Sequence, residues 1–334
     1  MVSQEFIRAS NAKLPSNLIG VFVGATSGIG EYTLKSFAQN CQSPKAYFVG
    51  RSQAAADRIT KELRTLNPNG TYHFIKSDIS LVKSVDSVCQ QIKEKETYIN
   101  ILVMSQGTMS QGMDTEEGLH LPATLLLHSR ARFIANLLPE LQRATVLRRV
   151  LSIFTGTKEG PMPITDFQMR NLGMNLIKMR GQAASMLTLY QEHFATLAPS
   201  VSFVHDFPGP VKSNIARGGG IINLLMRTSA KIIGPFVFIP EGDSGDRHLY
   251  LATSSRYSAR EGGVNGVEVE KGVEVARGTD GKVGSGCYTV DEKCESGNAE
   301  IVSVLKGLRE QGKGEEVWKH LVDEWVRITG KESI

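Results

Sequence analysis

Cysteine is scarce in this sequence, and its scarcity argues against two kinds of stabilising site. The 334 residues contain four cysteines, whose spacing matches neither a metal-binding pattern nor a dense disulfide framework. Cys287 and Cys294 could meet across a hairpin, although unpaired thiols are the commoner outcome for cysteines so scattered. The first residues also lack a charged and then apolar leader. We therefore expect no metal ligand set and a reducing, cytoplasmic environment.

An excess of charge of one sign is missing as well. The 38 basic and 34 acidic residues leave a formal net charge of +4, and the basic residues are dispersed among the acidic ones. This pattern argues against a nucleic-acid-binding surface. Long hydrophobic runs are also missing, because the most apolar stretch, residues 218–240, is interrupted by Arg227, Lys231 and a Gly-Pro pair. That stretch is too broken to be a transmembrane segment.

The apolar residues that are present alternate between strand-like and helix-like patterns. Strands are predicted at residues 18–23, 46–49, 72–76, 99–104, 150–154 and 201–205, and helices at 53–66, 82–95, 116–138 and 179–197. This β/α alternation predicts an α/β Rossmann fold, a doubly wound parallel sheet, in one domain spanning residues 1–334. Residues 261–334, with helices at 298–310 and 315–328, form a C-terminal extension that we interpret as an appended cap.

A glycine-spaced loop joins the first predicted strand to a helix. Its sequence is Gly24-Ala25-Thr26-Ser27-Gly28-Ile29-Gly30. The first glycine allows a tight turn, the second lets a phosphate approach the backbone, and the third lets the helix pack closely on the strand. Because the amino end of a helix attracts anions, these residues, including Thr26, Ser27 and Ile29, predict a dinucleotide-binding site.

The residues after the second strand indicate which dinucleotide binds. Enzymes that use the unphosphorylated cofactor usually place a carboxylate there for the ribose hydroxyls, whereas this chain has Arg51 followed by Ser52. A guanidinium offers a forked set of donors to phosphate oxygens. An ordinary surface charge is the alternative for Arg51, and we predict that it binds the 2′-phosphate of NADP(H).

These motifs together resemble the short-chain dehydrogenase/reductase family over nearly the whole chain. Segments 129–133, 156–160 and 276–282 are similar to a divergent fungal branch that serves secondary metabolism. The resemblance implies further cofactor contacts at the adenine, at the ribose and at the nicotinamide. These are Asp78 and Ile79, then Ser105, Gln106 and Gly107 in place of an Asn-Ala-Gly corner, and then Pro208, Gly209, Val211 and Ser213.

The catalytic set of that family, a Ser, a Tyr, a Lys and an Asn, is incomplete here. Thr155 stands at the Ser position, where its hydroxyl can donate the same hydrogen bond, and a structural role at the strand end is the alternative. Our alignment places Met179 and Ala183 at the Tyr and Lys positions, and neither side chain can transfer a proton. A formal Tyr-x-x-x-Lys at Tyr72 and Lys76 lies in a predicted strand, where it spans about 13 Å instead of one helical turn.

Three other polar residues are candidates for replacing the missing groups. His128 is the leading acid–base candidate because imidazole titrates near neutral pH, although a lone histidine on an apolar helix is more often structural. Lys158 and Arg180 could stabilise a developing oxyanion, and a solvated surface cation is the alternative for both.

The partner of this site is predicted to be a small, hydrophobic molecule. Residues 214–250 are expected to form an apolar lid over it, with core packing or a weak membrane-surface contact as alternatives. Small residues in helix 179–197 would permit a homodimer. The main prediction is an NADP(H)-dependent oxidoreductase with an atypical active site, acting on a secondary-metabolite intermediate. The alternatives are a non-redox isomerase, dehydratase or cyclase of the same fold, and a non-catalytic cofactor-binding protein.

Overall fold

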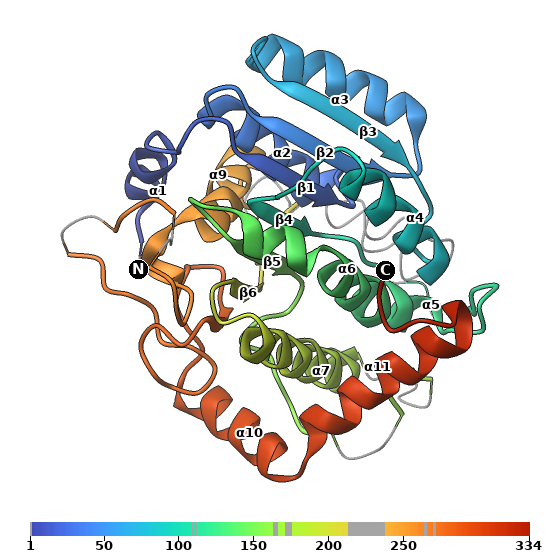
Figure 1. The fold of residues 1–334 in the computed structure, drawn as a ribbon. Helices are drawn as coiled ribbons and strands as arrows, with labels where there is room; N and C mark the ends of the chain where they lie inside the picture. The colour runs from blue at the N-terminus through green and yellow to red at the C-terminus, as the bar shows by residue number, and fades with distance from the viewer. Residues whose placement is uncertain are drawn as a thin grey trace.

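Seven parallel strands form one sheet in the computed structural model (Figure 1). Their order across the sheet is β3-β2-β1-β4-β5-β6-β7, so the direction of winding reverses between β1 and β4. This order confirms the predicted doubly wound Rossmann fold. The strands are β1 (Ile19–Val23), β2 (Lys45–Gly50), β3 (Thr71–Lys76), β4 (Ile101–Met104), β5 (Arg149–Ile153), β6 (Ser202–Asp206) and β7 (Cys287–Val290).

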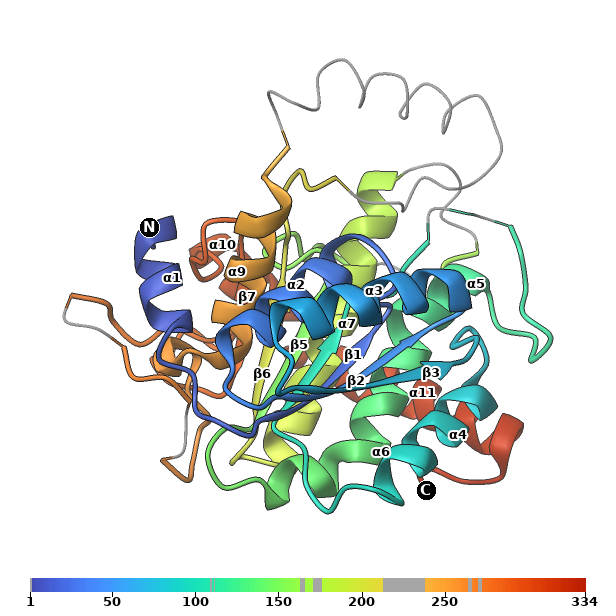
Figure 2. The ribbon, with the colours of Figure 1, turned by 90° about the horizontal axis from the view of Figure 1, so that it is seen from above.

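Helices cover both faces of this sheet (Figures 1 and 2). One face carries α2 (Gly28–Asn40), α3 (Gln53–Leu66) and α9 (Glu241–Thr253), with α1 (Gln4–Asn11) packed on α9. The other face carries α4 (Val82–Lys93), α6 (Ser129–Arg143) and α7 (Leu176–Leu197), with α10 (Ala299–Glu310) and α11 (Lys313–Thr329) packed against α7. The structure describes residues 2–108, 110, 112–162, 166–170, 176–212, 238–263, 266–269 and 272–334.

Each face of the sheet has its own apolar core. Along β1, Ile19, Val21 and Val23 enter the core beneath α4, α6 and α7, whereas Phe22 enters the core beneath α2 and α9. This division follows from the two-residue period of a strand. All five residues of β1 are buried, as is usual for a parallel sheet that is covered on both faces.

The helix predicted at residues 116–138 begins later than expected. Gly118 has a φ of +78°, a left-handed conformation that an α-helix cannot contain, and it closes a turn instead. The helical stretch begins with α5 (Leu121–Ala123), passes through a π-helical turn (Thr124–His128) and continues as α6 to Arg143. The start of α6 lies beneath the carboxyl ends of β4 and β5, where Arg130 donates to the main-chain oxygens of Met104 and Ile153.

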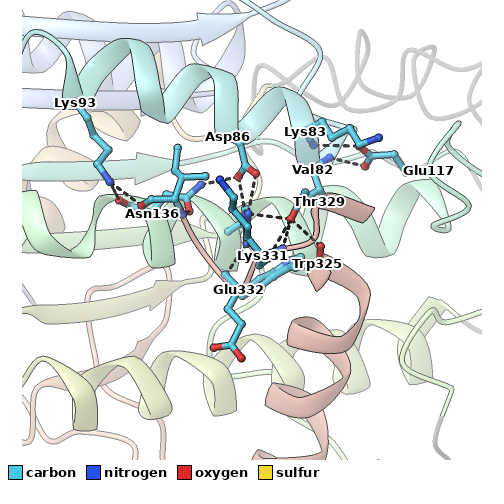
Figure 3. Close-up of polar contacts among 12 residues, drawn as sticks. Val82, Lys83, Asp86, Lys93, Glu117, Asn136, Trp325, Thr329, Lys331 and Glu332 are labelled. Atoms are coloured by element: carbon cyan, nitrogen blue, oxygen red, sulfur yellow. Dashed lines mark hydrogen bonds and ion pairs between the residues drawn. The ribbon is translucent and has the colours of Figure 1, made fainter. Parts of the chain in front are cut away.

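The C-terminal extension is part of the sheet and its covering layer, so the interpretation as an appended cap is wrong in this respect. It supplies β7, which pairs with β6, and α11, which packs against α4 and α7. Figure 3 shows the end of the chain against α4. Arg132, buried in α6, donates to both carboxylate oxygens of Asp86 at 2.6 and 2.7 Å and to the main-chain oxygens of Lys331 and Glu332. These bonds hold the chain end that follows α11 beside α4 and α6.

The predicted lid at 214–250 overlaps α9. That helix packs so closely on α2 that a Cβ atom on Gly245 would lie 2.5 Å from the main-chain oxygen of Tyr32. Residues 241–250 are therefore a layer of the fold and not a lid, while residues 213–237, including Ser213, lie outside the described residues. Within the described part of the chain, no helix combines the length and hydropathy needed to span a bilayer.

Candidate cofactor site and active site

The glycine loop lies against the residues that follow β4. Because β1 and β4 are paired neighbours, the loops after them meet at the carboxyl edge of the sheet. Gly24 has a φ of +80°, and a Cβ atom there would lie 2.8 Å from the main-chain nitrogen of Gln106. On Gly30, a Cβ atom would lie 2.3 Å from Ser105 Oγ. Side chains at these two glycines would therefore push the two loops apart. We call the region outside the carboxyl ends of β1 and β4, where the winding of the sheet reverses, the crevice.

Helix α2 begins in this crevice, at Gly28. The preceding Ser27 makes no side-chain capping bond to the helix. The first amide groups of a helix have no partner within the helix and carry partial positive charge. The start of α2 can therefore bind an anion such as a pyrophosphate group, while Ile29 packs against the apolar core.

Gln106 supplies an unusual polar group next to the glycine loop. The residue is only 6% exposed, and both its amide oxygen and its amide nitrogen are buried without a hydrogen-bond partner in the structure. Leaving a buried polar group unpaired costs about 1–3 kcal/mol. Together with Ser105 and Gly107 on either side, the Gln106 amide is placed to bind a polar ligand in the crevice.

The residues predicted to bind the adenosine half of NADP(H) and its 2′-phosphate lie together at the ends of β1, β2 and β3. A Cβ atom on Gly50, the last residue of β2, would lie 2.4 Å from Thr26 Cγ2, which places the glycine loop directly beside Arg51. The side chain of Arg51 is 77% exposed, and its Nη1 lies 3.9 Å from Asp78 Oδ2. Ser52 caps α3 by accepting a hydrogen bond from the Ala55 amide. Arg51 and Asp78 are thus neighbours at the open edge of the crevice, with Ile79 buried behind them.

Thr155 lies just past the end of β5, on the same edge of the sheet. Its main-chain N–H donates to His205 Nε2 at 3.1 Å. Its hydroxyl oxygen is buried and makes no hydrogen bond. His205 belongs to β6 and is fully buried, so a rigid strand holds the backbone of Thr155 while its hydroxyl stays available for another partner.

A buried carboxylate completes the support beneath Thr155. Glu159 Oε1 accepts hydrogen bonds from Thr188 Oγ1 at 2.7 Å and Thr289 Oγ1 at 2.6 Å, and Thr188 Oγ1 lies 2.9 Å from His205 Nδ1. Burial alone would raise the pKa of Glu159, but the hydrogen bonds from His205, Thr289 and Thr188 outweigh it and hold that pKa below its usual value. These bonds tie the loop after β5 to α7, β6 and β7.

The loops after β5 and β6 also meet. Lys158 Nζ lies 4.9 Å from the centre of the Phe207 ring, over its face. Pro208 and Gly209 follow directly, and Val211 is buried and forms a short parallel bridge with Ile239. The ammonium group of Lys158 therefore lies on the Phe207 ring, between two loops at the carboxyl edge of the sheet.

Comparisons with known proteins agree with this arrangement. Residues 19–120 match the family model described as short chain dehydrogenase. An oxidoreductase of Emericella nidulans is 38% identical over 331 residues, which cover 96% of this chain and 97% of that protein. Oxidoreductase andH of Emericella variicolor is 34% identical over 337 residues, covering 99% and 98%. The chain belongs to the short-chain dehydrogenase/reductase family. Among solved structures, L-sorbose reductase from Gluconobacter frateurii, complexed with NADPH and L-sorbose, shares the fold, with a TM-score of 0.55 and 15% identity over 77% of this chain and 97% of that chain.

In this short-chain dehydrogenase/reductase, α7 is the helix on which the alignment places the Tyr and Lys positions. Met179 is half-buried against the core, and Ala183 is buried. The loop after β5 packs directly on this helix, because Gly160 N–H donates to the Gly181 carbonyl at 3.1 Å and Ser185 Oγ donates to the Gly160 carbonyl at 2.6 Å. The small residues of α7 therefore make contacts within the chain, and the homodimer stays a prediction.

The other two catalytic candidates, Arg180 and His128, differ in their surroundings. Arg180 is exposed on the first part of α7. His128 is fully buried, and its Nε2 lies 3.1 Å from the amide nitrogen of Gln168, which also lies 3.0 Å from His320 Nε2 in α11. Burial, followed by the charges of His320 and Arg327, lowers the pKa of His128 to about 3. These contacts favour a structural role for His128.

Sequence reasoning missed the groups that support Thr155. Glu159 and His205 come from a loop and a strand separated by 46 positions, so no local spacing joins them. The available signal was a histidine and an aspartate at the end of an otherwise apolar strand, β6, where a buried polar side chain demands a partner.

Proposed function

We propose that the chain binds NADP(H) across the carboxyl ends of β1 and β4 and acts as an oxidoreductase on a hydrophobic small molecule. The observation that carries the proposal is the buried, unpartnered side-chain amide of Gln106, a residue whose main chain packs too closely on Gly24 to leave room there for a Cβ atom. A polar ligand in the crevice would satisfy this amide. The L-sorbose reductase of the same fold is a complex with NADPH, which supports the choice of ligand.

The residues present fit the two ends of this cofactor. The start of α2, from Gly28 to Gly30, would receive the pyrophosphate. Arg51 would bind the 2′-phosphate, and Asp78 beside it would contact the adenosine half. The corner of Ser105, Gln106 and Gly107 would hold the ribose, and the loop from Pro208 to Val211 would lie along the nicotinamide. Ser213 belongs to the same proposal but falls outside the described residues.

The chemistry then depends on groups of the chain at the carboxyl ends of β5 and β6. Bound NADPH supplies a hydride for a carbonyl carbon, and water supplies the proton that completes the alcohol. The Thr155 hydroxyl would donate to the carbonyl oxygen and orient it, while Lys158 would stabilise the negative charge that develops there. Arg180 directly precedes Gly181, whose carbonyl accepts from the loop after β5, and it is a further cation that could stabilise the developing charge.

A hydrophobic intermediate of secondary metabolism is the proposed substrate class. The apolar composition of residues 218–240 and the resemblance to the fungal branch support it. Met179 and Ala183 at the aligned Tyr and Lys positions favour one second candidate, a non-redox isomerase, dehydratase or cyclase that retains the cofactor crevice. In that case a substrate is converted in the presence of NADPH, but the absorbance of NADPH stays constant because the cofactor is not oxidised.

Cofactor titration tests the proposal. We expect NADPH to bind more tightly than NADH, and Arg51→Asp to reverse that preference, because the carboxylate repels the 2′-phosphate and accepts from the ribose hydroxyls. Arg64→Asp makes the same charge change on the exposed end of α3 and should leave the preference unchanged. Equal affinities of the unmodified chain for NADPH and NADH would remove the assignment to NADP(H).

A further inference from the structure

Arg130 places a buried positive charge beneath the carboxyl ends of β4 and β5. It is the second residue of α6 and is 1% exposed. Its guanidinium donates to the main-chain oxygens of Met104 at 3.0 Å, Gln106 at 2.5 Å and Ile153 at 3.0 Å. Met104 and Ile153 are the last residues of β4 and β5, and Thr155 follows two residues later. The guanidinium thus joins the floor of the crevice to the loop of the candidate active site.

This charge has no acidic counterpart among the residues that the structure describes. All the acceptors found for Arg130 are neutral carbonyl oxygens, at Leu125, Met104, Gln106 and Ile153. Arg132, two residues later on the same helix, shows the usual arrangement, because both of its bonds to Asp86 reach a carboxylate. Burial lowers the pKa of Arg130 to about 10, so the side chain is still protonated at neutral pH.

An unpaired buried charge reduces the free energy of unfolding, and neutral donors could satisfy the same carbonyl groups at a smaller cost. A ligand in the crevice whose charge interacts with Arg130 would account for the presence of the guanidinium. The nicotinamide ring is neutral when it is reduced and carries a positive charge when it is oxidised. The carbonyl oxygen of a substrate gains negative charge as it accepts a hydride.

We propose that Arg130 is a fixed cation beneath the reacting end of the cofactor, which makes the crevice select the neutral reduced nicotinamide over the cationic oxidised form. The proposal rests on the proposed function, since it needs a nicotinamide in this crevice. Arg130 is a positioning and electrostatic residue in this account, and it acts through space from under the Gln106 carbonyl without touching the substrate.

The size of the effect depends on the distance between the guanidinium and the bound nicotinamide ring, which we take as about 10 Å. Two like unit charges about 10 Å apart at an effective dielectric constant of about 20 change a binding constant by roughly tenfold. The unmodified chain should therefore bind NADPH about tenfold more tightly than NADP⁺. NADPH and NADP⁺ carry the same pyrophosphate and the same 2′-phosphate. Contacts with these groups therefore contribute equally to both affinities and cancel in their ratio.

Fluorescence titrations of NADPH and NADP⁺ test the proposal without any substrate. Arg130→Met should bring the two affinities within about threefold of each other, mainly by tightening NADP⁺ binding, whereas Arg130→Lys keeps a cation and should preserve most of the ratio. Arg149→Met is the matched control. Arg149 is also fully buried and donates to main-chain oxygens, of Leu251 and Ser254, but it is the first residue of β5 and so lies at the opposite edge of the sheet.

The outcomes separate the two proposals. If Arg130 only ties β4 to β5, its replacement by Met weakens both forms of the cofactor equally and the ratio is unchanged, which overturns the inference. Equal affinities of the unmodified chain for NADPH and NADP⁺ also overturn it, even if Arg130→Met does not fold. Failure of the unmodified chain to bind either form instead overturns the proposed function.

Discussion

Acidification should destabilise the folded chain through His128. The ordinary pKa of a histidine is 6.5, and in the fold burial, followed by His320 and Arg327, lowers that of His128 to about 3. As the pH falls below 6.5, the unfolded chain takes up a proton at this residue and the folded chain does not, so stability is full above pH 6.5 and is lost progressively toward pH 3. At pH 5 the difference amounts to about 2 kcal/mol, because each pKa unit corresponds to about 1.4 kcal/mol.

The local geometry explains why His128 stays neutral in the folded chain. The Gln168 amide nitrogen can only donate, so His128 Nε2 must accept from it at 3.1 Å. A proton on Nε2 would set two donors against each other in a buried site. The other ring nitrogen, Nδ1, is buried without a partner and offers no stabilisation to a charged ring.

Urea unfolding at pH 7 and pH 5 measures this effect. Between these values the unmodified chain should lose about 2 kcal/mol more of its free energy of unfolding than His128→Gln, which cannot titrate. Burial, followed by Lys95 and Lys45, also lowers the pKa of His73, a half-buried histidine of β3, so His73→Gln is the comparison and should reduce the loss by less than His128→Gln does. An identical loss in His128→Gln and the unmodified chain would refute the argument. Abolished turnover of a well-folded His128→Gln at pH 7, with NADPH affinity intact, would instead restore the acid–base hypothesis.

Two further changes test the packing of the site and of the chain end. Gly30→Ala places a Cβ atom 2.3 Å from the loop after β4, so it should weaken NADPH binding and destabilise the fold by about 1–3 kcal/mol, whereas Gly307→Ala, which meets nothing within 4 Å, should not. Asp86→Ala removes the carboxylate partner of the fully buried Arg132 and should cost about 3 kcal/mol in urea unfolding. Asp323→Ala breaks an exposed pair and should change stability by less than about 1 kcal/mol; equal losses in the two aspartate variants would contradict this reading.

Much of the fold was predictable because its signals are local. Helix α3 occupies residues 53–66 as predicted, and its start is marked by the capping Ser52 in the sequence itself. Gly24 and Gly30 likewise answer requirements of one short loop. The strand β7 was not predictable in this way, because it has four residues and is defined by pairing with β6, some eighty positions earlier in the chain.

The candidate site divides along the same line. The cofactor half comes from loops that directly follow strands, so a pattern of strand and glycine locates it. The support of Thr155 comes from Glu159, Thr188, His205 and Thr289, which lie on a loop, a helix and two strands. Apart from His205, at the end of an apolar strand, none of these residues stands out in the sequence. Only their meeting in the fold produces a buried hydrogen-bond network.

Arg130 and Arg132 illustrate why burial must be known before charge can be interpreted. They stand two positions apart on one helix, and the sequence offers no reason to treat them differently. Arg132 points to α4 and the chain end, where it pairs with the carboxylate of Asp86. Arg130 points to the carboxyl ends of β4 and β5, where the acceptors found among the described residues are main-chain carbonyl groups. With Met179 and Ala183 aligned to the Tyr and Lys positions, our proposed active site needs another source of positive charge. In our proposal Arg130 supplies that charge from beneath the ends of β4 and β5, and the supply of the proton falls to a separate group.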